Sequence, residues 1–184
     1  MTGTCFLESP EPVLIRDELT LLQIQELRRR AWSANGELPD FIAKQDILKD
    51  VHDIHGMHWA ILVDGKPVAA ARMCIHDDFA SSPDPEALDG YTNLIRVPLA
   101  SLTRLVVHPD FRRLGLSTLL DDVRIKYAEQ NGCKSIVSVT ETDFRIRKLK
   151  GMGFSQLGST RIRYLSYAPS YVLLRQLCDG HIPN

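Results

Sequence analysis

The sequence predicts a mixed α/β fold, in which a mostly antiparallel sheet is flanked by helices and contains one βαβ crossover. Strand-length apolar runs alternate with amphipathic helical patterns along the chain. Two of these runs are joined by Asp64 and Gly65, a pair typical of tight hairpin turns. A strand, a helix and a second strand follow one another between residues 99 and 140. We expect a single domain over residues 1–184.

The first half of the chain is expected to contain three strands and two helices. A short strand is expected at residues 12–16, followed by a helix at 18–32, where apolar residues recur at helical spacing. A second helix is expected over 41–54. Alternating apolar residues then predict the two strands of the hairpin, at 57–63 and 67–75.

The second half begins with residues 77–98, which are rich in Asp, Pro, Ser and Gly and predict a long loop, a feature typical of functional lids and mobile segments. A strand at 99–107 precedes a helix that starts at Leu116, with polar residues such as Asp121 and Arg124 on the side away from the core. The remaining expected elements are a helix end at Asn131-Gly132, a strand at 134–140, a helix at 143–152 and a closing hairpin of strands at 159–167 and 170–177.

Composition excludes several classes of partner. The net charge is −1 and the isoelectric point is near 6.6, so no broad basic surface for nucleic acid or an anionic membrane is expected. No apolar run approaches the roughly 20 residues that span a bilayer, and the first residues lack the pattern of a signal peptide. We therefore expect a cytoplasmic protein. The four cysteines form no Cys-x-x-Cys pair, which argues against a zinc site or a disulfide framework.

The segment 112–117, Arg-Arg-Leu-Gly-Leu-Ser, lies between an expected strand and an expected helix. The first N–H groups of a helix have no intrahelical partners and carry partial positive charge. Gly115 allows a ligand to approach the backbone closely, Ser117 is small, and Arg112 and Arg113 add full positive charge. These features predict a cradle for a phosphate group.

Around this loop, the segment 102–120 resembles the GCN5-related N-acetyltransferases (GNAT), whose coenzyme A loop reads Arg/Gln-x-x-Gly-x-Gly/Ala. Residues 112–117 match that pattern, with Ser117 at the final small position. Gly-Met-Gly-Phe at 151–154 resembles the Gly-Phe that ends the family's fourth helix, and 58–73 resembles its second and third strands. The resemblance covers about residues 58–177.

The resemblance implies transfer of an acyl group from acetyl-CoA or another acyl-CoA to the primary amine of a small molecule. The loop amides would bind the pyrophosphate, and the strand at 102–107 would separate from that at 135–140 to admit the pantetheine arm. A backbone N–H at Val106, or at Leu105, would stabilise the thioester oxyanion. The implied cofactor-binding set is Leu105, Val106, Val107, Arg112, Arg113, Leu114, Gly115, Leu116, Ser117 and Thr118.

Two residues that many members of that family use are missing. Leu149 stands where a tyrosine would protonate the leaving thiolate, and the strand segment 101–104 lacks a glutamate that would act as the base. Glu141 and Asp143, just after the next strand, lie where a carboxylate could reach the amine through water, and Glu141 is the candidate base. The alternative for the acidic residues here is helix capping, with Thr142 or Asp143 as the N-cap.

A second resemblance is to the acyl-homoserine-lactone synthases and N-acyl amino acid synthases of the same fold. Their ordered polar residues would correspond to Arg28, Trp32, Asp46, Asp50, Asp53, Arg72 and Arg104. Ser101 occupies the place of their glutamate. This alternative implies a long-chain acyl group delivered by an acyl carrier protein, which could dock on arginines at 28–30, 112, 113, 145 and 147. A non-catalytic coenzyme A sensor is a further alternative.

Three histidines, His52, His55 and His58, raise the question of a metal site. Their spacing, with Gly56 among them, does not keep all three on one helical face, so we expect no metal. Entry of one histidine into the acceptor cleft, or pairing with Asp53, are the alternatives. The oligomeric state is left open, a homodimer included.

Overall fold

The computed structural model describes residues 10–34, 47–160 and 169–178. The strands are β1 Val13–Ile15, β2 Met57–Val63, β3 Lys66–His76, β4 Leu99–Val107, β5 Ser135–Thr140, β6 Ser155–Thr160 and β7 Ser170–Gln176. They form one seven-stranded sheet in the order β1-β2-β3-β4-β5-β7-β6. Every neighbouring pair is antiparallel except β4 and β5. The predicted mixed, mostly antiparallel sheet with flanking helices is confirmed.

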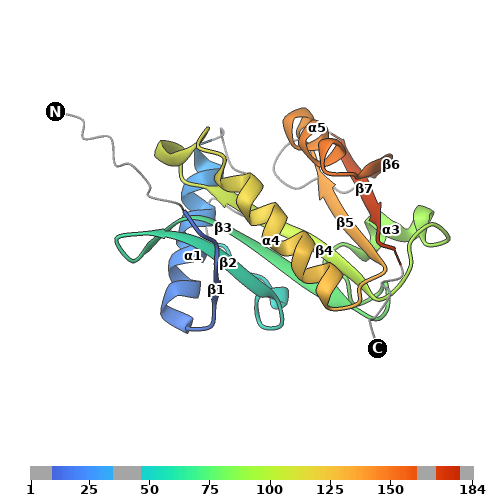
Figure 1. Ribbon diagram of the computed structural model, residues 1–184, viewed down its shortest axis with the longest axis horizontal. Helices are drawn as coiled ribbons and strands as arrows, with labels where there is room; N and C mark the ends of the chain where they lie inside the picture. Colours follow the sequence, from blue (N-terminus) through green and yellow to red (C-terminus); the bar gives the residue numbers. More distant parts are fainter. Residues whose placement is uncertain (1–9, 35–46, 161–168, 179–184) are drawn as a thin grey trace.

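The helices are α1 Glu18–Ser33, α3 Pro85–Leu88, α4 Leu116–Gln130 and α5 Asp143–Gly151, with short 3₁₀ turns η1 Val51–Asp53, η2 Asp89–Tyr91 and η3 Pro109–Phe111. The long helices α1 and α4 cover opposite faces of the sheet (Figure 1). Successive strand residues point to opposite faces, and accordingly Trp59 and Ile61 pack with α4, whereas Ala60 packs with α1. No described helix is long and apolar enough to cross a membrane.

The parallel pair β4 and β5 separates part-way along its length. Pairing begins at Leu99 with Ser135 and ends at Ser101 with Val137, although both strands continue for several residues. On its other side, β4 contains a bulge, because Arg104 and Leu105 together lie opposite one residue of β3. Arg104 adopts a positive φ of 53° at this bulge. The strands therefore diverge just where the resemblance implied an entry for the pantetheine arm.

Most predicted elements agree with the structure, and the hairpin turn has the expected left-handed residues, with φ of 50° at Asp64 and 73° at Gly65. The helix predicted over 41–54 is wrong for its described part. Residues 47–50 are not helical, and only the 3₁₀ turn Val51–Asp53 follows. The side chain of Asp50 caps that turn by accepting the His52 N–H at 3.0 Å, so the helix pattern is interrupted there.

Two further differences concern the second half of the chain. The predicted loop at 77–98 contains the short helix α3, which begins with a proline, and the turn η2. Strand β6 begins at Ser155, four residues before the predicted start, and residues 161–168 of the predicted hairpin lie outside the described residues. Strand β7 is inserted between β5 and β6.

Candidate active site

A cavity of about 830 Å³ occupies the space opened by the separation of β4 and β5. One wall is formed by residues 102–107 of β4 and another by 138–140 of β5, continuing into Glu141 and Thr142. The loop at 111–113 and the first residues of α4 border one end. Ala31 and Trp32 of α1 and residues 50–52 border the cavity on the side covered by α1. The cavity thus joins the phosphate-cradle loop to the N-terminal part of the chain.

The cradle loop has the backbone geometry that its sequence predicts. Gly115 is the N-cap of α4 and has a φ of 78°, and Arg113 before it has a φ of 66°. Among the described residues no side chain caps this helix, so the amides of Leu116 and Ser117 at its start are available to an anion. A Cβ at Gly115 would meet no described atom within 4 Å, which means that the space in front of the backbone is open. The residues present therefore fit a diphosphate.

The predicted site residues are largely brought together around the cavity. Its lining includes Leu105, Val106, Val107, Arg112, Arg113, Leu116, Ser117 and Glu141. Leu114, Gly115 and Thr118 belong to the same loop but not to the lining. The Thr118 N–H already donates to the Gly115 carbonyl at 2.8 Å, and Arg112 donates to the Ala31 carbonyl at 2.9 Å. Arg112 therefore ties the loop to the C-terminal end of α1.

The structure places two features on which the predicted chemistry depends: the position of the missing tyrosine and the predicted oxyanion donors. Leu149 is fully buried in the apolar cluster beneath α4 and α5, so this position places no polar group in the cavity. In β4, Val106 pairs with Ala70 immediately after the bulge at Arg104 and Leu105. Of the two predicted oxyanion donors, Leu105 therefore lies in the bulge, and Val106 is the first residue paired with β3 after it.

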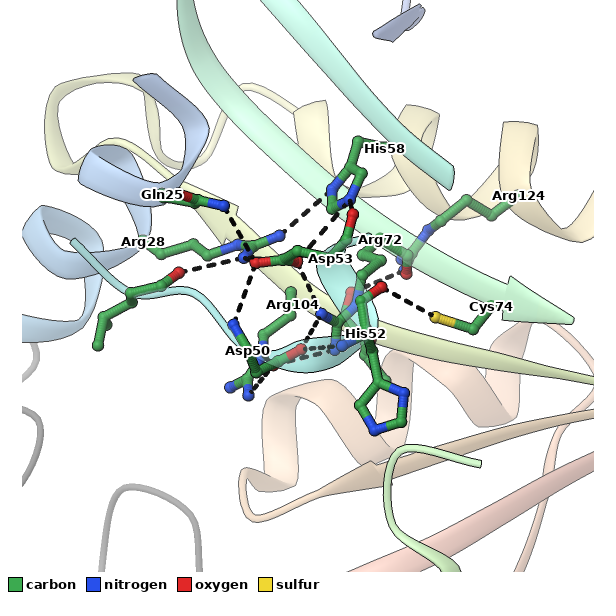
Figure 2. A network of polar contacts seen from close by, with 12 residues as sticks. Gln25, Arg28, Asp50, His52, Asp53, His58, Arg72, Cys74, Arg104 and Arg124 are labelled. Carbon is green, nitrogen blue, oxygen red and sulfur yellow. Dashed lines mark hydrogen bonds and ion pairs between the residues drawn. The ribbon is translucent and has the colours of Figure 1, made fainter. Parts of the chain in front are cut away.

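A chain of alternating arginines and aspartates runs from α1 to the cavity (Figure 2). Arg28, fully buried, contacts Asp53 at 2.7 Å, and Asp53 contacts Arg72 at 2.7 Å. Arg72 contacts Asp50 at 2.5 Å, and Asp50 in turn contacts Arg104 at 2.5 Å. These residues, far apart in the sequence, all belong to the set named for the second resemblance, of which Asp46 lies outside the described residues; Ser101 still stands in place of its glutamate.

The chain of ion pairs ends at the cavity wall. Asp50, Arg72 and Arg104 all line the cavity, and the Arg104 guanidinium lies 5.3 Å from the centre of the Trp32 ring. Burial opposes ionisation of Asp50, but hydrogen bonds and charge from Arg72 and Arg104 outweigh it and hold the pKa of Asp50 well below its usual range. The cavity therefore presents a fixed carboxylate beside a partly exposed guanidinium.

The histidines have separate roles. His58 is buried, and its Nδ1 lies 3.3 Å from Arg28 Nη2 while its Nε2 lies 3.2 Å from the Asp53 carbonyl. Since arginine can only donate, Nδ1 accepts and Nε2–H donates, which is the neutral tautomer. Burial and the Arg28 charge lower the pKa of His58 accordingly. His52 lines the cavity, as one alternative expected. Among the described residues, no group of three His, Cys, Asp or Glu side chains is placed to hold a metal.

A second polar cluster was missed from the sequence, which placed Asp121 and Arg124 on the side of the helix away from the core. Both are fully buried, because that side of α4 faces β3, β4 and α5. Asp121 accepts from Arg124 at 2.5 Å, from Arg145 and from Lys148 at 3.0 Å. The sequence signal for this cluster was an Asp and an Arg three residues apart on a helix, with further cations on the next helix.

Arg28 was also misjudged as a docking residue, because it is fully buried.

The fold and the cavity define a class of acyltransferases, and comparisons with known proteins agree. The model of the acetyltransferase (GNAT) family matches residues 21–154. The chain therefore belongs to the GNAT acetyltransferase family, whose members use acetyl-CoA or another acyl-CoA as co-substrate. No curated protein sequence matches the chain.

Three solved structures illustrate the shared fold. The ribosomal-protein-S18-alanine N-acetyltransferase from Escherichia coli is 14% identical, with 94% of this chain and 98% of that chain covered and a TM-score of 0.62. FeeM, an N-acyl amino acid synthase from uncultured soil microbes, is 12% identical, with 91% and 92% covered and a TM-score of 0.66. The NatC complex bound to Gag peptide and CoA is 15% identical, with 91% and 99% covered and a TM-score of 0.61.

Proposed function

We propose that this enzyme transfers an acyl group from an acyl-CoA thioester directly to the primary amine of a small molecule. The observation that carries the proposal is the continuity of the cavity, which connects the cradle loop, the diverging ends of β4 and β5, and the α1 side. A donor held by its phosphates at the loop reaches the gap between the strands with its thioester. The acceptor then approaches from the side of Trp32 and Asp50.

The reaction needs a neutral amine, a donor for the oxyanion and a destination for one proton. The amine nitrogen forms a bond to the thioester carbon, the backbone N–H at Val106 or Leu105 stabilises the oxyanion, and the carbon–sulfur bond then breaks. Glu141, at the cavity wall, receives the amine proton through water. With Leu149 buried, solvent rather than a side chain at that position protonates the thiolate.

The test is acyl transfer from acetyl-CoA to a panel of primary amines, measured as release of the free coenzyme A thiol. Glu141→Gln is expected to lower kcat by about 100-fold with little change in the KM for acetyl-CoA, the usual size of a lost general base. Asp143→Asn, an exposed carboxylate two residues away, is the matched control. Equal effects of the two substitutions would remove Glu141 from the mechanism. Coenzyme A binding without turnover of any amine would favour the sensor alternative.

A second candidate is an N-acyl amino acid synthase that takes a long-chain acyl group from an acyl carrier protein. It is favoured by the ion-pair chain that ends in Asp50 and Arg104 at the cavity, since a carboxylate beside a guanidinium complements the two charged groups of an amino acid. The structural likeness to FeeM supports the same candidate.

This candidate predicts faster turnover with an acyl carrier protein than with acyl-CoA when amino acids are the acceptors. Arg104→Met is expected to raise the KM for the amino acid about 10-fold or more, whereas Arg113→Met at the cradle loop raises the KM for the donor instead. Faster turnover with acyl-CoA and uncharged amines would reject the second candidate and retain the first.

A further inference from the structure

We propose that Arg145 and Lys148 of α5 form a side-chain wall of the donor's phosphate site, opposite the cradle loop, and that buried Asp121 positions both. The proposal rests on the proposed function, because it assumes a donor whose phosphate lies at the start of α4. The loop pattern assigns none of these residues, and the second resemblance gives Arg145 only a place in carrier docking.

The geometry places both cations at the correct end of the cavity. Arg145 and Lys148 are three residues apart, so they lie on the same face of α5, and both line the cavity together with Arg113 and Ser117. The Lys148 ammonium donates to the Ser117 hydroxyl at 2.8 Å, which joins α5 to the first turn of α4. The wall is thus in direct contact with the cradle.

Asp121 holds these two side chains from behind. Its carboxylate is fully buried, with Lys148 at 3.0 Å from Oδ2 and the Arg145 Nη2 at 2.8 Å from Oδ1. The side chains of Arg145 and Lys148 remain 12% and 13% exposed, whereas Arg124, the third partner of Asp121, is completely enclosed. Arg124 is held by the carbonyls of Leu120, Arg72 and Thr103, so it faces the sheet rather than the cavity.

The charges of this cluster do not balance. Among the described residues, three cations, Arg124, Arg145 and Lys148, share the carboxylate of Asp121, which leaves two positive charges in excess. Burying a charge is costly unless it is paired, and a purely structural bridge between α4 and α5 needs only one cation. The carboxylate of Asp50, which also lines the cavity, is already paired with Arg72 and Arg104. A phosphate bound between the wall and the loop supplies the missing negative charge.

A bound phosphate can replace one of the hydrogen-bond partners of Lys148, the Ser117 hydroxyl. Its bond to Ser117 is a hydrogen bond to a neutral hydroxyl, which a phosphate oxygen replaces with a stronger charge-assisted one. Burial lowers the pKa of Lys148, although Asp121 opposes the shift, so a second anion nearby favours the charged ammonium. The shared chemistry is a phosphate on a pantetheine arm, found in the diphosphate of coenzyme A and in the single phosphodiester of a carrier protein.

The experiment measures calorimetric binding of three probes to the full chain: coenzyme A, 4′-phosphopantetheine and pantetheine. Lys148→Met and Arg145→Met are each expected to raise the Kd for coenzyme A about 10-fold or more and to leave pantetheine binding unchanged. Lys150→Met, exposed on the same helix, is the matched control and is expected to change neither. Thermal unfolding of every variant verifies that the fold is intact.

The two sources of phosphate are separated by 4′-phosphopantetheine. Weakened binding of this probe supports a wall that binds the phosphate next to the arm, as in a carrier protein. Weakening confined to coenzyme A supports binding of one of the phosphates that 4′-phosphopantetheine lacks. Equal losses for pantetheine and coenzyme A, or no loss for either, overturn the proposal. Turnover of S-acetylpantetheine by the wild-type chain tests acyl transfer independently, so failure of the wall and failure of the proposed function give different results.

Discussion

Two glycines at opposite ends of α4 have similar backbone conformations, but only one of them belongs to the cradle loop. Gly115, before the first turn, has a φ of 78°, and Gly132, after the last turn, has a φ of 72°. A Cβ at either position would meet no described atom within 4 Å. The strain that a side chain would cause at positive φ is therefore comparable at the two positions, while only Gly115 is part of the cradle loop.

Alanine substitution separates these effects. Gly115→Ala and Gly132→Ala are each expected to lower the free energy of unfolding by about 1 kcal/mol, from the positive φ alone. Only Gly115→Ala is expected to weaken acetyl-CoA binding, about 10-fold or more, because its methyl group enters the open space in front of the first-turn amides. Chemical denaturation and calorimetry check the two parts. Equal affinity in the two variants would show that the cradle does not bind the donor.

At the scale of residues, the sequence predicts the loop but not the buried charges. The cradle follows from a glycine, two arginines and a helix start, which are local features. Burial of Arg28 and Asp121 depends on which side of a helix faces another element, and both residues resemble solvent-exposed charges in the sequence. Their partners at positions 53 and 145 come from elements far away in the chain. The spacing of Asp121 and Arg124 indicates their pair within one helix, but pattern alone could not assign the contacts between elements.

At the scale of elements, α1 is attached to the rest of the fold by Arg28, an arginine on its buried face. Arg28 donates to both oxygens of Asp53 and to the Leu48 carbonyl at 3.1 Å, so it joins α1 to the segment that precedes β2. Burial lowers the pKa of Arg28, although Asp53 counters the shift. The guanidinium is thus a structural link as well as the start of the chain of ion pairs.

Removal of this link is expected to be costly. Arg28→Met should lower the free energy of unfolding by about 3 kcal/mol, because it leaves the Asp53 carboxylate buried with fewer partners. Arg29→Met, the exposed neighbour on the same helix, should change it by less than about 0.5 kcal/mol. Urea denaturation of both variants gives the comparison. Similar small losses would mean that the remaining partners of the Asp53 carboxylate, which are Arg72, Gln25 and the Asp50 N–H, satisfy it.

The elements themselves were predicted best where their pattern was long. The regular periods of α1, α4 and the strands β2 to β5 specify them locally, and the Asp64-Gly65 turn fixes the hairpin. The helix predicted over 41–54 failed in its described part because the Asp50 side chain competes for backbone N–H groups. The order of β5, β7 and β6 depends on pairing between distant strands, which no local pattern encodes.

At the scale of the whole molecule, the buried aspartates link stability to pH. Burial raises the pKa of Asp121, but the hydrogen bonds from Arg145 and the charges of Arg124, Arg145 and Lys148 outweigh it and lower the pKa to about 2. A depressed pKa gives stability that is complete above the ordinary value of 3.8 and is lost as the pH falls toward the folded value. The same direction holds for Asp50 and Asp53.

The free energy of unfolding is therefore expected to decrease as the pH falls from about 4 to 2, which denaturation curves at successive pH values measure. In Asp121→Asn, the slope in this window should be smaller by up to about 1.4 kcal/mol per pH unit, the contribution of one carboxyl group. The exposed neighbour variant Asp122→Asn is the matched control and should keep the wild-type slope. An unchanged slope in Asp121→Asn would contradict the depressed pKa.

The position of Trp32 at the cavity gives the molecule a built-in optical probe. The chain has two tryptophans; Trp32 lies in the cavity wall against Arg104, and Trp59 is buried in the core against the Tyr127 ring. Their fluorescence therefore reports different events. In a Trp59→Phe variant the emission is expected to follow occupancy of the cavity beside Trp32, and in a Trp32→Phe variant it is expected to follow unfolding, without any attached dye.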